Sequence, residues 1–237
     1  MRRYLPVLVL LAALAFAVSP LLSNGFGGYR PDQFPIPQAD PPIQPAGWAF
    51  SIWGLIFAWL VAGSAFGAWK RADDPDWQPM RPALLVSLAL GAFWIEPAHR
   101  TPIGATVLIV AMLVPALLAF LRAGRRDPVW QVRPVALYAG WLTAATGASF
   151  GMVLGGWGIL SQQAAAILCL LAVTIAALLV EGRRPGEWAY PVGVVWALVG
   201  IFAANLSPAN PIVLALSAGA ALLLAYRAAT SLRAKAR

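Results

Sequence analysis

The sequence is poor in charged residues, cysteine and histidine. Only 11% of its 237 residues are charged, whereas a soluble domain carries about 25%. That deficit is too large for a surface facing water, so the sequence excludes an ordinary soluble domain. One cysteine, Cys169, excludes an internal disulfide framework and a cysteine-based zinc site. One histidine, His99, leaves no Ser/His/Asp catalytic set and no second good axial ligand for a haem iron.

Long apolar runs are what the sequence has instead, because 60% of the residues are hydrophobic. A helix that crosses a bilayer needs about 20 mainly apolar residues. The breaks between runs contain Gly, Pro, Asp or pairs of Arg, and Pro82, Pro134 and Pro211 stand where helices are expected to begin. We therefore predict an all-α, polytopic transmembrane bundle of about eight spans: 4–22, 47–69, 82–98, 102–122, 134–154, 162–180, 189–206 and 211–227.

The basic residues follow the loops with a strong bias. With this threading, all of the 17 Lys and Arg residues except Arg30 and Arg100 fall on one side. Cytoplasmic loops of membrane proteins carry such an excess. The bias predicts a multi-pass protein of the cytoplasmic (inner) membrane with both termini in the cytoplasm. The net charge of +8 therefore indicates membrane topology, and we expect no nucleic-acid partner.

Two segments near the N-terminus allow alternatives. Arg2 and Arg3, the apolar run that follows and Ala15-Phe16-Ala17 also suit a cleaved signal peptide, which would leave seven spans. The segment 23–46 is rich in Pro and Gly and contains aromatic residues, so we expect an extended loop on the outer side. That loop is either a connector or a lid over a site.

Three tryptophan-containing elements are spaced along the first five spans. Pro45, Trp48, Phe50 and Trp53 open the second span; Phe93, Trp94, Glu96 and Pro97 end the third; Tyr138, Trp141, Ala145 and Thr146 lie in the fifth. In this order the elements resemble the TspO/MBR family, which includes the translocator proteins and the bacterial tryptophan-rich sensory proteins. The resemblance covers 1–158, a five-helix unit. Residues 159–237 form an extension of about three spans, as in longer bacterial members.

The resemblance implies a receptor-type or sensory protein that binds a flat apolar ligand, expected to be a porphyrin or another tetrapyrrole, between the first five helices. No cofactor is required for that role, and the expected partners are the lipid bilayer and the small apolar ligand, with a homodimer left open. The candidate ligand-binding residues are Trp48, Phe50, Trp53, Trp94, Tyr138, Trp141, Ala145, Ala148 and Ser149. Outer groups that could contact ligand propionates are Arg30, Glu96, His99 and Arg100.

This sequence departs from the family pattern in three places. Ser149 stands where the family often has Asn, and Glu96 separates Trp94 from Pro97. The cholesterol-recognition pattern that some members carry after the fifth helix is absent here, which places steroid binding in doubt. Other tryptophans lie at span ends or in loops, where the aromatic belt of the membrane interface is the expected role: Trp69, Trp77, Trp130, Trp157 and Trp188.

Small residues in the fifth span predict close helix packing. At about 100° per residue, Gly140, Ala144, Gly147, Gly151 and Gly155 share one face, while Trp141, Ala145, Ala148 and Met152 share another. The glycine face lets a neighbouring backbone approach, and the second face leaves space beside one large ring. Gly63 and Gly67 form a similar pair in the second span.

Two other classes of function remain as alternatives. A small-molecule transporter would have inverted repeats and broken helices, and no convincing repeat is visible, although Pro115 interrupts the fourth span. A porphyrin- or lipid-modifying enzyme is the less favoured alternative, because no catalytic constellation is visible and only the resemblance keeps it open.

Overall fold

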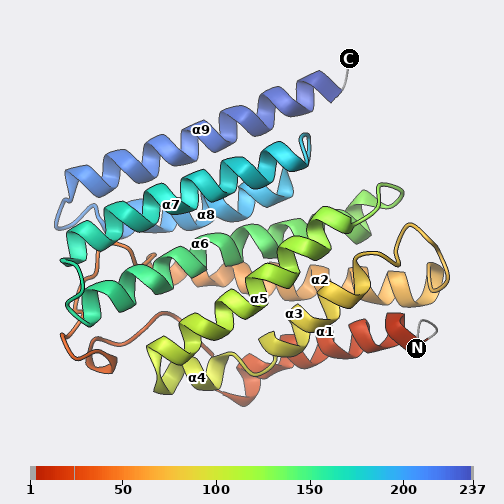
Figure 1. Ribbon diagram of the computed structural model, residues 1–237, viewed down its shortest axis with the longest axis horizontal. Helices are drawn as coiled ribbons and strands as arrows, with labels where there is room; N and C mark the ends of the chain where they lie inside the picture. Colours follow the sequence, from red (N-terminus) through yellow and green to blue (C-terminus); the bar gives the residue numbers. More distant parts are fainter. Residues whose placement is uncertain (1–3, 24, 236–237) are drawn as a thin grey trace.

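The computed structural model describes residues 4–23 and 25–235, and its regular elements in that part are all helices (Figure 1). They follow the predicted spans: α1 (Leu5–Leu22), α2 (Ile52–Lys70), α3 (Arg81–Gly91), α4 (Ile95–Arg100), α5 (Pro102–Arg122), α6 (Arg133–Gly156), α7 (Gln162–Arg183), α8 (Ala189–Ala204) and α9 (Pro211–Lys235). A 3-10 turn, Gly47–Ser51, precedes α2, and a π turn, Pro128–Val132, precedes α6.

Seven of the described helical segments are long and apolar enough to cross a membrane, and α8 is a shorter apolar helix of 16 residues. The prediction of an all-helical polytopic membrane protein is therefore confirmed. At 1.5 Å per residue, α8 falls short of a hydrocarbon layer about 30 Å thick. It is enclosed by α6, α9 and the turn before α2.

The third predicted span differs from the expectation, because it is broken into α3 and α4 around Ala92–Trp94. Pro97 is the physical reason. Its ring clashes with the carbonyl of residue 93 in a continuous helix, and it lacks the N–H that would bond there. Proline is tolerated in a first helical turn, so a new helix begins at Ile95. The break turns the Trp94 side chain inward, where it is buried.

The centre of the bundle is α6. In an apolar stretch of 18 residues within the segment Pro128–Gly156, 72% of the residues are buried. The corresponding stretch of α9 has 22% of its residues buried. It packs against α5 on one side and against α7 and α8 on the other (Figure 1). One continuous hydrophobic cluster includes residues from α1 through α9. The predicted division at residue 158 therefore falls within a shared core, and it stays a prediction as a domain boundary.

Close backbone approaches occur at the glycines of α6 and α2. A side chain at Gly140 would meet the carbonyl of Tyr190 in α8, and Gly193 in turn faces the carbonyl of Leu137. Gly147 packs against Val173 of α7. The remaining contacts are with loops, with the π turn and with the start of α7: Gly151 with Ile43, Gly155 with Gln38 and Gln162, Gly63 with the Trp130 carbonyl, and Gly67 with the Trp77 ring.

The loops lie at the two ends of the bundle (Figure 1). The loops predicted to share one side of the membrane lie at the same end. At one end Arg126 binds Asp74 at 2.8 Å, and Arg184 Nη2 donates to the Gly124 carbonyl at 2.8 Å. At the other, Asn205 Nδ2 donates to the Pro42 carbonyl at 2.9 Å. Which end faces the cytoplasm stays a prediction. Arg2, Arg3 and Arg237, which also count toward the charge bias, lie outside the described residues.

The arginine-rich end contains a partly buried polar cluster, and it includes a tryptophan for which the aromatic-belt role was expected. Trp77 is only 1% exposed, and its Nε1 donates to Asp127 at 2.9 Å. The guanidinium of Arg71 binds the same carboxylate, with Nε 2.8 Å from Oδ2. This hydrogen bond and charge lower the pKa of Asp127. Trp77 is therefore part of the fold's interior, whereas Trp69 is 83% exposed, as the belt role requires.

Candidate functional site

The residues 25–46 form a loop (the 25–46 loop) that covers one end of the bundle and is fastened at several points. The Ile36 N–H donates to the Gly156 carbonyl at 2.9 Å. Gln33 Nε2 donates to the carbonyls of Ala98 and His99, at 2.9 and 3.0 Å. Within the loop, the Tyr29 N–H donates to Gln44 Oε1 at 3.0 Å. The loop is therefore an ordered cover held by α4 and α6.

An aromatic cavity lies beneath this loop, between α2, the turn that joins α3 to α4, α5, α6 and α8. The loop contributes Phe26 and Tyr29, the 3-10 turn before α2 contributes Phe50, and α2 contributes Trp53. The complete lining is Phe26, Gly28, Tyr29, Gln44, Pro45, Phe50, Trp53, Trp94, Ile109, Trp141, Ala145, Ala148, Ser149, Met152 and Ala197. The volume open to the centres of water-sized molecules is about 40 Å³, enough for only a few waters.

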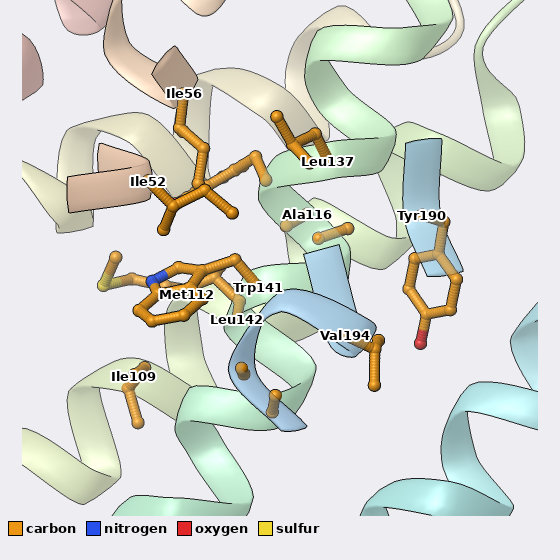
Figure 2. Packing of buried hydrophobic residues seen from close by; sticks show 14 of the residues in the cluster. Ile52, Ile56, Ile109, Met112, Ala116, Leu137, Trp141, Leu142, Tyr190 and Val194 are labelled. Carbon is orange, nitrogen blue, oxygen red and sulfur yellow. The ribbon is translucent and has the colours of Figure 1, made fainter. Parts of the chain in front are cut away.

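The rings of the cavity meet edge to face. The Trp141 centroid lies 6.1 Å from that of Trp53 and 5.8 Å from that of Phe50, with interplanar angles of 82° and 85°. Phe26 lies 4.7 Å from Trp94 at 80°. Such pairs are favoured by the ring quadrupoles and hold each face in a fixed orientation. Figure 2 shows Trp141 in one buried cluster with Ile52 of α2 and with Ile109 and Met112 of α5.

A second, more open cavity shares its wall with the first. The volume that the centres of water molecules could occupy in it is about 330 Å³. Phe26, Phe50, Trp53 and Trp94 line this cavity as well. Its other lining residues belong to α1, α2, α4 and the start of the loop. Four aromatic side chains therefore separate a small inner cavity from a larger space beside α1.

The hydroxyl groups of Tyr29, Ser149 and Thr106 form a hydrogen-bonded chain beside the inner cavity. Thr106 Oγ1 donates to the Pro102 carbonyl at 2.7 Å, which uses its one proton. Ser149 Oγ, 2.6 Å away, must then donate to Thr106. Tyr29 OH, 2.8 Å from Ser149, must in turn donate to Ser149. The proton directions leave the Tyr29 oxygen with unused acceptor capacity only, and burial raises the pKa of this phenol.

The indole N–H of Trp141 is a donor that lacks an acceptor among the described residues, whereas the Tyr29 oxygen is an acceptor with unused capacity. The residue is 1% exposed, and its Nε1 has no hydrogen-bond partner among the described residues. The other cavity indole with a buried N–H, that of Trp94, donates to the Ala105 carbonyl at 3.1 Å. Buried polar groups are seldom left unpaired, because desolvation without a partner costs about 1–3 kcal/mol. Trp141 therefore lines the cavity with a buried indole N–H that has no partner among the described residues.

Seven of the nine predicted ligand-binding residues line the cavity together, and two do not. Trp48 is 48% exposed and packs on Trp196 of α8, with ring centroids 5.3 Å apart. Tyr138 is fully buried deeper in the bundle, where its hydroxyl lies 2.9 Å from that of Ser87. Both side chains hold helices together at positions outside the cavity lining.

The four predicted polar residues also lie outside the lining. Arg30 binds Asp32 at 3.1 Å, and Arg100 binds Glu96 at 2.6 Å, all on exposed side chains. His99 Nε2 lies 2.8 Å from the Gly25 carbonyl and 3.1 Å from that of Ser23. The imidazole therefore fastens the beginning of the loop. Of the described residues, no group of three His, Cys, Asp or Glu could hold a metal ion.

Sequence reasoning assigned no site role to several lining residues. Met152 shares the Trp141 face of its helix, and Phe26 and Tyr29 are among the aromatic residues of the 23–46 segment. Gln44 and Ile109 carried no comparable signal. Ala197 comes from α8, beyond the five-helix unit. A single alanine in an apolar helix has nothing in its pattern that indicates which neighbour it faces.

The fold and this cavity define a class: a multi-pass helical membrane protein with an enclosed aromatic cavity beneath an ordered loop. A family model described as TSPO-like protein matches residues 6–229. The chain therefore belongs to the TSPO-like family, and the match extends through the three helices beyond residue 158. No curated protein and no solved structure matches the chain.

Proposed function

We propose that this TSPO-like membrane protein binds a flat apolar ligand, with a tetrapyrrole such as a porphyrin as the candidate, in the cavity beneath the 25–46 loop. The observation that carries the proposal is the joint lining of one cavity by Phe50, Trp53, Trp94 and Trp141 with Ala145 and Ala148 beside the last ring. Aromatic faces next to small residues suit a planar apolar molecule.

The polar groups at the cavity favour a ligand with one hydrogen-bond acceptor and one hydrogen-bond donor. The unpaired N–H of Trp141 would donate to a carbonyl or similar oxygen, and the Tyr29 oxygen would accept from an N–H or O–H. The cavity lining contains no charged side chain. Ligand carboxylates would therefore have to reach the outer surface, where Arg30 and Arg100 are already paired with acidic residues.

The size of the cavity makes movement part of the proposal. A porphyrin macrocycle is far larger than this cavity, which has room for only a few waters. The four aromatic side chains between the two cavities and the 25–46 loop above them are the parts that would have to move. Displacing Phe26 would join the inner cavity to the space beside α1, because both cavities share that ring.

Titration of purified protein with protoporphyrin tests the proposal, read by quenching of tryptophan fluorescence and by the porphyrin's own absorbance. Trp141→Ala should weaken binding at least about tenfold, since it removes the stacking surface and the N–H. Ala148→Leu should weaken it by filling the space beside the ring. Trp69→Phe and Ala172→Leu are matched controls, because both positions are exposed outside the cavity.

The outcomes separate clearly. Loss of binding in both cavity variants, with both controls unchanged and all four proteins eluting as monodisperse peaks, supports the site. Unchanged affinity in Trp141→Ala and Ala148→Leu would place porphyrin binding elsewhere. Failure of the unmodified protein to bind any porphyrin would remove the tetrapyrrole as ligand.

A further inference from the structure

A cleft at the arginine-rich end of the bundle is separate from the aromatic cavity. It is bounded by the loop after α5, the start of α6, the α7–α8 loop and the last turns of α9. Its lining is Gly124, Arg125, Pro128, Val132, Arg133, Arg184, Pro185, Gly186, Glu187, Ser231 and Leu232. The volume that the centres of water molecules could occupy in this cleft is about 700 Å³, much larger than the same volume in the aromatic cavity.

Positive charge dominates the lining, with three guanidinium groups against the one carboxylate of Glu187. Glu187 accepts a hydrogen bond from the Ala189 N–H at 3.3 Å. Nearby acidic groups are committed elsewhere. Glu181 binds Arg227 Nε at 2.7 Å, and Asp76 accepts the backbone N–H groups of Arg125 and Arg126. The cleft therefore keeps a net positive lining.

The three guanidinium groups have unmet capacity for an anion. Among the described residues, none of Arg125, Arg133 and Arg184 is in an ion pair. Arg184 donates to the carbonyls of Phe120 and Gly124, and its burial lowers the pKa of the guanidinium against the opposing effect of the Glu187 charge. The Nε of Arg133 is buried without a hydrogen-bond partner in the described part of the chain. A partly desolvated cation with a free donor is stabilised by an anion that accepts from it.

The cleft lies where the helices leave their apolar spans. The Arg133 guanidinium lies 5.4 Å from the Trp188 ring centroid, and Trp130 nearby in sequence is 40% exposed. Tryptophans with exposed edges mark the headgroup level of a bilayer. Val132 and Leu232 are apolar members of the lining, of which Leu232 is 40% exposed and Val132 2% exposed. A lipid at this level presents its phosphate to the arginines and its glycerol and chain ends to those side chains.

We propose that this cleft binds the phosphate headgroup of an anionic phospholipid, held by Arg125, Arg133 and Arg184, at a site bounded by α6 and the α7–α9 extension. Guanidinium groups suit phosphate oxygens, because the planar fork can donate two parallel hydrogen bonds. The Ser231 hydroxyl, now 3.3 Å from Glu181 Oε1, lines the same cleft. Basic clefts between helices on the cytoplasmic side are typical lipid-headgroup sites.

Native mass spectrometry of the full chain in detergent tests the site, with phosphatidylglycerol, phosphatidylcholine or inorganic phosphate added separately. Each arginine near a headgroup contributes enough for about a fivefold change, so Arg125→Gln should weaken phosphatidylglycerol binding about fivefold. Arg125→Gln with Arg133→Gln should weaken it about thirtyfold. Arg122→Gln with Arg183→Gln is the matched control. It removes the same charge at the same end, from exposed residues outside the cleft.

Preference for phosphatidylglycerol over phosphatidylcholine, lost in the cleft variants and kept in the control, supports the proposal. Equal losses in the cleft and control pairs would reduce it to general surface charge and overturn the site. Equal binding of phosphatidylcholine would overturn the requirement for an anionic lipid, and inorganic phosphate binding as tightly as phosphatidylglycerol would overturn the lipid as source. The exposed Arg125→Gln variant alone decides the matter if the double variant does not fold.

Discussion

The hydroxyl of Tyr29 in the 25–46 loop lies 2.8 Å from the hydroxyl of Ser149 in α6, 120 positions later in the sequence. This contact joins the cover of the aromatic cavity to its wall. Tyr29 is only 8% exposed, and its ring also packs edge to face on Phe26 and Phe34 of the same loop. The loop is therefore tied to the cavity both by a hydrogen bond and by ring packing.

Removing that hydroxyl should loosen the cover. We expect Tyr29→Phe to keep the ring packing, to cost about 1 kcal/mol of the free energy of unfolding, and to speed porphyrin association several-fold, because one fastening of the loop is lost. Stopped-flow fluorescence measures the association rate. Tyr4→Phe, at an exposed residue of the other end, is the control. Identical association rates in all three proteins would mean that the loop does not limit entry.

The contact between α6 and α8 should tolerate no added methyl group. A Cβ at Gly140 would press on the backbone carbonyl of Tyr190, which cannot move aside as a flexible side chain could. We expect Gly140→Ala to destabilise the protein by about 1–3 kcal/mol, the usual cost of overpacking. Thermal unfolding in detergent measures this. Gly219→Ala in α9 has nothing within 4 Å and should leave the melting temperature unchanged or raise it. A Gly140→Ala melt equal to the original would refute the close approach.

Acid should destabilise the arginine-rich end through Asp127. The hydrogen bond from Arg71, followed by that from Trp77, lowers the pKa of this carboxyl in the folded protein. A lowered pKa contributes stability that is present above the unfolded value of about 3.9 and is lost as the pH falls through the folded value. We therefore expect a constant melting temperature from pH 7 to pH 5 and a decline below about pH 4.

Substitution isolates this carboxyl. Asp127→Asn should lower the melting temperature at pH 7 and flatten its dependence below about pH 4. The exposed Asp40, which has no ion pair in the described part of the chain, supplies the control Asp40→Asn. If the melting temperature of Asp127→Asn falls with decreasing pH as steeply as that of the original protein, the acid effect belongs to other groups.

Labelling decides the orientation in the membrane. With the buried Cys169 replaced by alanine, Asp40→Cys should react with a membrane-impermeant maleimide from outside the cell, and Arg125→Cys should react only after the membrane is opened. Both positions are exposed, and the loops that contain them, the 25–46 loop and the loop between α5 and α6, lie at opposite ends of the bundle (Figure 1). Reaction of both cysteines from the same side would contradict the threading itself.

Particular residues show where sequence reasoning succeeded and where it stopped. The helical face of Trp141, Ala145, Ala148 and Met152 follows from helical periodicity, and the structure places all four on the cavity. Tyr138 is three positions before Trp141 on a neighbouring part of that face, yet its side chain lies deeper and bonds Ser87 of α3. Periodicity gives a direction around one helix, but it does not give the distance to the next helix.

The sequence by itself determined that the protein is an all-helical membrane protein, where most of its helices begin, and which loops share an end, although the third span is broken and α9 continues to Lys235, beyond the predicted end at 227. Those features depend on local composition, on proline and on the distribution of arginine. Only the tertiary structure decided that Trp77 is buried on Asp127, that Ala197 joins the cavity, and that Arg125, Arg133 and Arg184 line one cleft. Such pairings arise from the tilt and docking of helices that are distant in the chain, and in lipid the apolar faces of these helices carry nearly identical sequence signals.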